Sequence, residues 1–285
     1  MTFFDVLVLA VVQGVCEMLP VSSSAHVILT AKLMGFDPTT PEMTLLLVML
    51  HTGTMLAVII YFWRSWRDRY FSSASTFWPF ARTVAVATAL TGAVGLALLF
   101  IIEHVILRGT HAEIEQLFGN VYIIAAGLAA AGIIIIVSSR HPTSAQGRTL
   151  SNTQSAWIGA VQGLCLPFRG FSRSGATIST GLLLGIDKVR SEEFSFALAV
   201  VLTPPVIAKE MYRFYKAYGS QALAGNMLHV AWPSLAGMLL SFVAALVALK
   251  WLSQWLEHGK WHIFGYYCLF ASGMVLVTSH TLHWA

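Results

Sequence analysis

The stretch at residues 13–26, QGVCEMLPVSSSAH, decides how this chain folds. It places an acid, a proline, three serines and a histidine between apolar segments. Pro20 interrupts the helix before it, because proline lacks the amide hydrogen that a helix interior needs. The two pieces on either side, at about 3–19 and 22–36, are each too short for roughly 30 Å of hydrocarbon. The stretch therefore predicts a re-entrant helix–loop–helix hairpin.

The rest of the chain has the composition of a membrane protein. Of its 285 residues 56% are hydrophobic and 11% are charged, and the mean hydropathy is +0.71, whereas soluble domains carry about 25% charged residues. Apolar runs such as 44–63 and 121–137 are continuous rather than alternating, which indicates helices and not barrel strands. The net charge of +4 is spread over loops, which suggests contact with anionic lipid and argues against a nucleic-acid partner.

The chain repeats itself. VQGVC at 12–16 returns as VQGLC at 161–165, SSSA at 22–25 as SRSG at 172–175, and TAKLMGFD at 30–37 as TGLLLGID at 180–187. Three matches in one order at nearly one offset indicate a duplicated unit. We therefore expect a single membrane domain over 1–285 that consists of two repeats, at about 1–145 and 150–285.

Each half has five hydrophobic pieces, of which the first two are short. In the first half they lie at about 3–19, 22–36, 44–63, 80–102 and 118–138, and in the second at 154–167, 173–186, 193–214, 231–252 and 262–282. Three full spans per half is an odd number, so the second half must enter the membrane upside down. The prediction is an all-α polytopic membrane protein, an inverted-topology repeat with six transmembrane helices and two re-entrant hairpins, whose broken helices mark a site near the midplane.

Positive charge predicts the topology. One side carries Arg64, Arg67, Arg69, Arg82, Arg140, Arg148, Lys188, Arg190, Lys250 and Lys260, and the other carries Lys32, Arg108, Lys209, Arg213 and Lys216. The richer side is expected in the cytoplasm, which leaves both termini on the outer side.

The first hairpin carries groups that suit chemistry on an anion. Gln13 and Glu17 are four residues apart and share a helix face. The second short helix starts with three serines in N-cap positions, Ser22, Ser23 and Ser24, with His26 in its first turn. The amides and positive field of a helix N-terminus attract phosphate and disfavour imidazolium. His26 is therefore expected to be neutral and available as a base or nucleophile.

The second hairpin, PFRGFSRSGAT at 167–177, supplies cations. Ser172 or Ser174 can cap the following helix, and Thr177 shares a face with Arg173. The guanidinium group of Arg173 forms a planar fork that matches phosphate oxygens, and Arg169 adds a second cation. If the two hairpin tips meet, they enclose a carboxylate, a histidine, hydroxyls and arginines, which are the parts of a phosphoryl-transfer site.

Other interpretations of these residues remain open. Glu17 and Arg173 could form a structural ion pair, and the serines could serve only as caps. His51, inside a span, could line the same cavity or pack structurally. Inverted repeats with broken helices are also a transporter plan, so a lipid or anion transporter or flippase that uses this pocket is the alternative function.

The two motifs resemble those of a known family, the bacterial undecaprenyl pyrophosphate phosphatases. QGVCEMLPVSSSAH is similar to its (E/Q)-x-x-x-E-plus-P-V-S-S-x-x-H signature, and RGFSRSGAT to its P-G-x-S-R-S-x-x-T signature. The resemblance implies an enzyme of the bacterial plasma membrane, with a site that opens to the periplasm and Mg²⁺ or Ca²⁺ as a helper. It implies that the enzyme removes the terminal phosphate of undecaprenyl pyrophosphate, recycles the lipid carrier for the cell wall and confers bacitracin resistance.

The resemblance also assigns site residues. Glu17, Ser23, His26 and Arg173 map to catalytic positions, with Glu17 as the metal ligand, and the substrate-binding positions are Gln13, Ser22, Ser172, Ser174 and Thr177. Gln13 and Arg169 depart from the family pattern, since many members have Glu and Pro there. His26 or Ser23 attacks phosphorus, or His26 activates water, and the sequence leaves these routes open. The expected partners are the polyprenyl pyrophosphate and membrane lipids, and a homodimer is left open.

Overall fold

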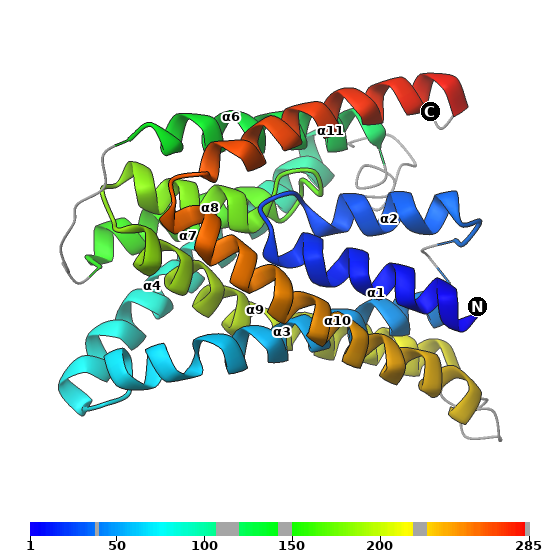
Figure 1. Ribbon diagram of the computed structural model, residues 1–285, viewed down its shortest axis with the longest axis horizontal. Helices are drawn as coiled ribbons and strands as arrows, with labels where there is room; N and C mark the ends of the chain where they lie inside the picture. The colour runs from blue at the N-terminus through cyan, green and yellow to red at the C-terminus, as the bar shows by residue number, and fades with distance from the viewer. Residues whose placement is uncertain (38–39, 107–119, 142–149, 219–226, 283–285) are drawn as a thin grey trace. The chain divides into compact units, whose positions relative to one another are not determined.

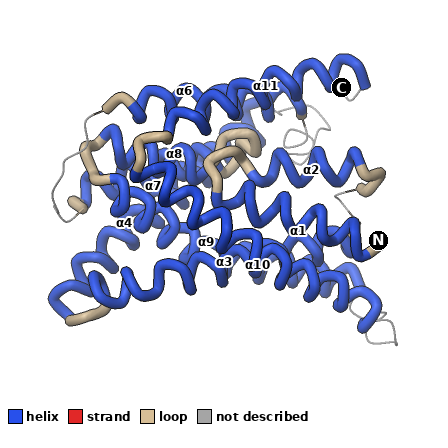
Figure 2. Tube along the Cα trace, viewed as in Figure 1, coloured by secondary structure: helices blue, strands red, loops and turns tan. Residues whose placement is uncertain are grey.

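The computed structural model describes residues 1–37, 40–106, 120–141, 150–218 and 227–282. Within these ranges every regular element is a helix (Figure 2). In chain order (Figure 1) they are α1 (Phe3–Met18), α2 (Ser23–Leu33), α3 (Pro41–Tyr70), α4 (Ala74–Ile101), the π-helical η1 (Ile102–Ile106), α6 (Val121–Ser139), α7 (Asn152–Cys165), α8 (Arg173–Leu183), α9 (Lys188–Tyr218), α10 (Met227–Glu257) and α11 (Trp261–Leu282).

Six segments in the described ranges are long and apolar enough to cross a membrane. They are Met43–Tyr70, Ala74–Val105, Val121–Ser139, Lys188–Lys209, Trp232–Glu257 and Trp261–Ser279. Each coincides with one of the six runs that the sequence predicts to span. The structure therefore confirms the prediction of an all-α polytopic membrane protein with six long apolar helices.

The four remaining α-helices are short and pair into two hairpins. α1 and α7 have 16 and 14 residues, and α2 and α8 have 11 each. At 1.5 Å per residue the longest extends about 24 Å, less than the hydrocarbon thickness. α1 packs against α2, and α7 packs against α8. These are the two predicted helix–loop–helix hairpins, and their re-entry into the membrane stays a prediction.

Side chains define where the first helix of each hairpin begins. At the start of α1, Asp5 accepts a hydrogen bond from the Thr2 amide (2.6 Å), and Thr2 Oγ1 accepts one from the Asp5 amide (3.3 Å). The hydrogen bond from the Thr2 amide to the Asp5 carboxylate is the largest cause that lowers the pKa of Asp5. At the start of α7, Ser151 and Gln154 form the same reciprocal arrangement, at 3.1 and 3.0 Å. Such a capping box satisfies backbone amides that have no partner within the helix.

The chain forms two compact units, and neither is a sequence half. The first unit comprises Met1–Met18, Ser23–Arg64 and Ala199–Leu252. The second unit comprises Leu19–Ser22, Ser65–Leu198 and Ser253–Ala285. Each unit thus combines a hairpin from one half with a long helix from the other: α1 and α2 with α10 in the first unit, and α7 and α8 with α4 in the second.

Glycines allow each hairpin to pack closely on that long helix. In the first unit, a Cβ at Gly14 of α1 would lie 2.6 Å from Ala244 Cβ and 2.6 Å from the Ser241 carbonyl oxygen, both on α10. In the second unit, a Cβ at Gly163 of α7 would lie 2.7 Å from Val94 Cβ and 2.9 Å from the Thr91 carbonyl oxygen, both on α4.

These two sets of contacts are equivalent under the sequence repeat. Gly14 and Gly163 differ by 149 positions, and Ser241 and Ala244 follow Thr91 and Val94 by 150. The hairpin of each half therefore packs on the fourth hydrophobic piece of the other half in the same way. A duplicated unit would account for this equivalence, and the duplication stays a prediction.

The loop of the second hairpin lies directly on α6. A Cβ at Gly170 would lie 1.9 Å from the Ile124 carbonyl oxygen, and a Cβ at Gly127 would lie 2.6 Å from the Phe171 amide nitrogen. Both distances are far shorter than a van der Waals contact. The atoms concerned belong to the backbone, so they cannot move aside as a flexible side chain could. α6 packs in turn against α8 and α11, and Figure 1 shows α6 and α11 running side by side.

We expect Gly170→Ala to destabilise the protein strongly, because its methyl group and the backbone of α6 cannot occupy the same space. The free energy of unfolding should fall by about 3 kcal/mol, at the upper end of what overpacked sites show. The measurement is the thermal midpoint of the purified protein in detergent. Gly92→Ala is the matched control, because a Cβ at Gly92 on α4 meets nothing within 4 Å. Equal midpoints for the two variants would contradict this account of the loop.

Candidate functional site

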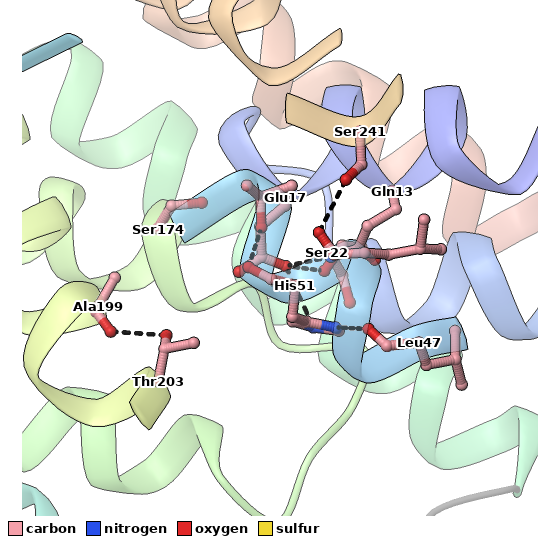
Figure 3. A network of polar contacts seen from close by, with 12 residues as sticks. Gln13, Glu17, Ser22, Leu47, His51, Ser174, Ala199, Thr203 and Ser241 are labelled. Atoms are coloured by element: carbon pink, nitrogen blue, oxygen red, sulfur yellow. Dashed lines mark hydrogen bonds and ion pairs between the residues drawn. The ribbon is translucent and has the colours of Figure 1, made fainter. Parts of the chain in front are cut away.

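A carboxylate at the end of α1 is the centre of a polar cluster in the first unit (Figure 3). One oxygen of Glu17, Oε2, accepts a hydrogen bond from the Ser23 hydroxyl and one from Gln13 Nε2 at 3.4 Å. The same oxygen lies 3.8 Å from His51 Nε2. The structure thus brings together three residues that the sequence assigns to the site, and it adds a fourth.

The turn after α1 creates this arrangement. Gln13 and Glu17 are one helical turn apart on α1, and α1 ends at Met18, two residues before Pro20. In the four-residue turn Leu19–Ser22, the Val21 amide donates to the Leu19 carbonyl at 2.8 Å. Ser22 then has φ of +68°, a left-handed conformation that residues other than glycine seldom adopt. The chain reverses there, and Ser23 at the start of α2 comes back to Glu17.

His51 joins the cluster from α3, and its hydrogen bonds define its tautomer. Nδ1 lies 2.9 Å from the Leu47 carbonyl oxygen. A carbonyl only accepts, so Nδ1 carries the hydrogen and Nε2 is the ring atom directed at Glu17. The His51 side chain is 40% exposed, against 15% for Glu17. The sequence left His51 between a cavity role and a packing role, and the structure places it beside the carboxylate.

A divalent cation fits this cluster only if the substrate shares it. Among the described residues, no three His, Cys, Asp or Glu side chains gather as a ligand set. Gln13 Oε1 is nevertheless buried without a hydrogen-bond partner, next to the Glu17 carboxylate. Mg²⁺ and Ca²⁺ prefer oxygen ligands, and Mg²⁺ is commonly held by one or two carboxylates plus substrate phosphates. The donor set therefore suits a cation held jointly by Glu17, Gln13 and a phosphate group.

The loop of the second hairpin is held by serines in the second unit. Ser172 Oγ accepts a hydrogen bond from the Gly175 amide at 3.2 Å and so caps α8, as predicted. Ser174 Oγ lies 3.4 Å from the Leu19 carbonyl oxygen, and the Ser22 hydroxyl donates to the Arg169 carbonyl. These contacts bring the Leu19–Ser22 turn against the loop of the second hairpin, within the second unit.

The signature SRSGAT directs its hydroxyls inward. Ser172, Ser174 and Thr177 are only 3%, 4% and 1% exposed, whereas Arg173 is half-buried. Thr177 Oγ1 lies 2.8 Å from the Arg173 carbonyl oxygen and 2.6 Å from Ser195 Oγ. Arg173 is therefore the cation that the loop presents at the N-terminus of α8, where helix amides add positive potential.

Two other predicted residues have clear positions. His26 lies in the first turn of α2 and is half-buried. The Arg169 side chain is exposed, and its backbone carbonyl accepts a hydrogen bond from Ser22 in the turn of the first hairpin. Arg169 thus adds charge next to the loop without being part of its buried frame.

A second buried polar cluster lies at the start of α9, where the sequence showed no site. Glu193 pairs with Arg69 Nη1 at 2.7 Å and accepts hydrogen bonds from the Ser65 and Tyr70 hydroxyls. Glu192 accepts one from Ser253 Oγ at 2.6 Å. These contacts anchor the polar first turns of α9 to the ends of α3 and α10, which is a structural role.

Comparison with known proteins shows which sequences this chain is similar to. The family model "Bacitracin resistance protein BacA" matches residues 6–274. The chain is 58% identical over 281 residues to "Undecaprenyl-diphosphatase 2" of Acinetobacter baylyi, covering 97% of this chain and 98% of that one. It is 33% identical over 261 residues to an undecaprenyl-diphosphatase of Thermus thermophilus, covering 90% of each, and 29% identical over 289 residues to one of Bdellovibrio bacteriovorus.

Proposed function

This chain belongs to the bacitracin resistance protein BacA family, and on that premise we propose that it is a membrane phosphatase. Its substrate is undecaprenyl pyrophosphate, from which it releases inorganic phosphate and leaves undecaprenyl phosphate. The reaction recycles the lipid carrier for cell-wall synthesis and confers bacitracin resistance. The names of the relatives support a diphosphatase rather than the transporter alternative.

The hydrogen bond from Ser23 to Glu17 is the observation that carries the mechanism. A serine hydroxyl is a weak nucleophile until a neighbouring base takes its proton. Glu17 receives that proton as Ser23 Oγ forms a bond to the terminal phosphorus and the anhydride P–O bond breaks, releasing undecaprenyl phosphate. Water then attacks the phosphoserine, the bond between Ser23 Oγ and phosphorus breaks, and Glu17 returns its proton to Ser23 Oγ. The protons of the attacking water leave with the released phosphate, and Ser23 is restored. Attack by His26, or by water that His26 activates, is the competing route.

The second hairpin binds the diphosphate. The Arg173 guanidinium and the amides at the N-terminus of α8 stabilise the negative charge on the transferring group. Ser172, Ser174 and Thr177 complete this anion site, and Ser22 adds a hydroxyl from the turn that contacts the loop of the second hairpin. Gln13 binds substrate from the cluster around Glu17 in the first unit. Mg²⁺ or Ca²⁺ held by Glu17, Gln13 and substrate oxygens would neutralise further charge on the diphosphate.

The topology that we propose places the site on the periplasmic side of the bacterial plasma membrane. If both hairpins re-enter the bilayer, the six spans leave the two termini on one side. The excess of Lys and Arg on the opposite side makes that side cytoplasmic, so the termini are periplasmic. The equivalent packing of Gly14 and Gly163 supports the inverted repeat on which this topology depends.

Trapping the phosphorylated enzyme tests the mechanism. We expect purified wild type in detergent, mixed with a polyprenyl pyrophosphate and quenched early, to carry phosphate on Ser23. Ser23→Ala should abolish the label and lower turnover at least ~100-fold, because it removes the hydroxyl that donates a hydrogen bond to Glu17. Ser24→Ala, the neighbouring hydroxyl, is the control and should retain the label.

Other outcomes of this experiment point elsewhere. Phosphohistidine is acid-labile and phosphoserine is not, so parallel acid and neutral quenches would reveal His26 as the nucleophile. Turnover without label on either residue would favour attack by water. Wild type that releases no phosphate, yet moves lipid or anions in liposomes, would overturn the phosphatase in favour of the transporter.

A further inference from the structure

One face of α9 lies along α8 through two serines that are one helical turn apart. Ser195 Oγ is 2.6 Å from Thr177 Oγ1. Ser191 faces Gly181 of α8, where an added Cβ would lie 2.6 Å from Ser191 Oγ. Both serines are buried, at 1% and 2% exposed. Only Ser195 reaches the signature loop, since the Ser191 hydroxyl has no hydrogen-bond partner among the described residues.

The hydrogens in this contact can be assigned. Thr177 has one hydroxyl hydrogen, and the Arg173 carbonyl oxygen at 2.8 Å can only accept it. When Thr177 donates to that carbonyl, the hydrogen between the two hydroxyls must come from Ser195. The result is a directed chain in which Ser195 donates to Thr177 and Thr177 donates to the backbone of Arg173.

We propose that Ser195 is a positioning residue that orients Arg173 through Thr177. Arg173 is the first residue of α8, where the helix has no preceding turn to hold the backbone in place. The chain of hydroxyls supplies that constraint from α9. α9 is itself anchored by the pair of Glu193 with Arg69 at 2.7 Å, two residues before Ser195. The inference rests on the function proposed above and adds a residue that lies outside both signatures.

The test compares Ser195→Ala with Ser191→Ala in the full-length protein. Loss of one hydrogen bond in the chain should lower kcat/KM for phosphate release about tenfold in Ser195→Ala, equivalent to about 1.4 kcal/mol. The effect should fall mainly on kcat, because charge stabilisation in the transition state depends most on the position of the guanidinium. Ser191→Ala should change kcat/KM less than twofold. The thermal midpoint of Ser195→Ala should lie only slightly below that of Ser191→Ala, because only Ser195 loses a hydrogen bond, and both variants should remain folded at the assay temperature.

A double-variant cycle then shows whether Ser195 acts through Thr177. Thr177→Val removes the hydroxyl and keeps the side-chain shape. If the chain is real, adding Ser195→Ala to Thr177→Val costs less than twofold, because the connection is already broken. Ser195→Thr, which retains a hydroxyl, should recover at least half of the activity lost in Ser195→Ala. Additive losses, or equal effects of Ser195→Ala and Ser191→Ala, would overturn the proposal.

Amide hydrogen exchange tests the positioning role of Ser195 without relying on phosphatase activity. Ser195→Ala should speed exchange in the peptide 173–177 several-fold, and Ser191→Ala should leave it unchanged. If wild type releases no phosphate, the phosphatase assignment fails, yet the exchange rates still decide whether Ser195 orders the first turn of α8. Unchanged exchange in Ser195→Ala would contradict the positioning role whatever the activity.

Discussion

Replacing Arg173 by alanine is expected to lower kcat/KM for phosphate release from a polyprenyl pyrophosphate by about 10³-fold. An arginine that stabilises transition-state charge in phosphoryl transfer contributes a factor of about 10³–10⁵ to the rate, so its removal should cost at least the lower value. The structure supports the large value because Arg173 is half-buried at the start of α8, between the buried Ser172 and Ser174. The measurement is steady-state kinetics of purified protein in detergent.

Arg169→Ala is the matched control for this prediction. Arg169 is an arginine of the same loop, but its side chain is exposed, whereas that of Arg173 is half-buried. We expect Arg169→Ala to lower kcat/KM less than tenfold and to do so mainly at low ionic strength, as for a distant charge. Arg173→Lys should recover little, because an ammonium group cannot form the planar bidentate contact. Equal losses in Arg169→Ala and Arg173→Ala would mean that the loop contributes only general positive charge.

The long helices could be predicted from hydrophobicity wherever the segment is apolar throughout, as lipid contact requires. The prediction fell short at the polar ends of α3 and α9. The run at 193–214 was predicted as the span, yet α9 begins at Lys188. Its first turns contain Glu192 and Glu193, which raise the apparent polarity and are buried by partners from α3 and α10. A hydropathy window cannot detect burial that depends on residues more than 60 or 120 positions away.

The site could be predicted where its geometry is local. Gln13 and Glu17 follow from helical spacing, Pro20 from its missing amide hydrogen, and the return to Ser23 from the run of serines. Ser22 shows the limit of this reasoning. It was expected at an N-cap position, but it has a left-handed φ, and its hydroxyl binds the carbonyl of Arg169, 147 residues away. His51 and Ser195 were not assigned for the same reason, because their partners Glu17 and Thr177 lie on other helices.

Glu17→Gln is expected to lower kcat by about 10³-fold while leaving the fold intact. General-base catalysis contributes about 10²–10⁴-fold. The glutamine amide oxygen can still accept a hydrogen bond from the Ser23 hydroxyl, so the local contact is kept. The amide is not basic enough to take the hydroxyl proton. The variant should therefore bind substrate and fail to form phosphoserine. The measurements are the early-quench label on Ser23, steady-state kcat and the thermal midpoint.

Gln13→Glu provides the matched comparison, because it adds a carboxylate on the same face of α1, one turn earlier. It creates a second acidic ligand, which the family signature given above allows at this position, so we expect activity to be retained and its dependence on added Mg²⁺ or Ca²⁺ to increase. Wild type should show a shallower response to a chelator than Gln13→Glu, because the site that we propose offers a cation only one carboxylate. If Glu17→Gln retained more than a tenth of wild-type kcat, Glu17 would not be the base for Ser23. The hydrogen bond between Glu17 and Ser23 would then be structural, and His26 would be the next residue to test as the base.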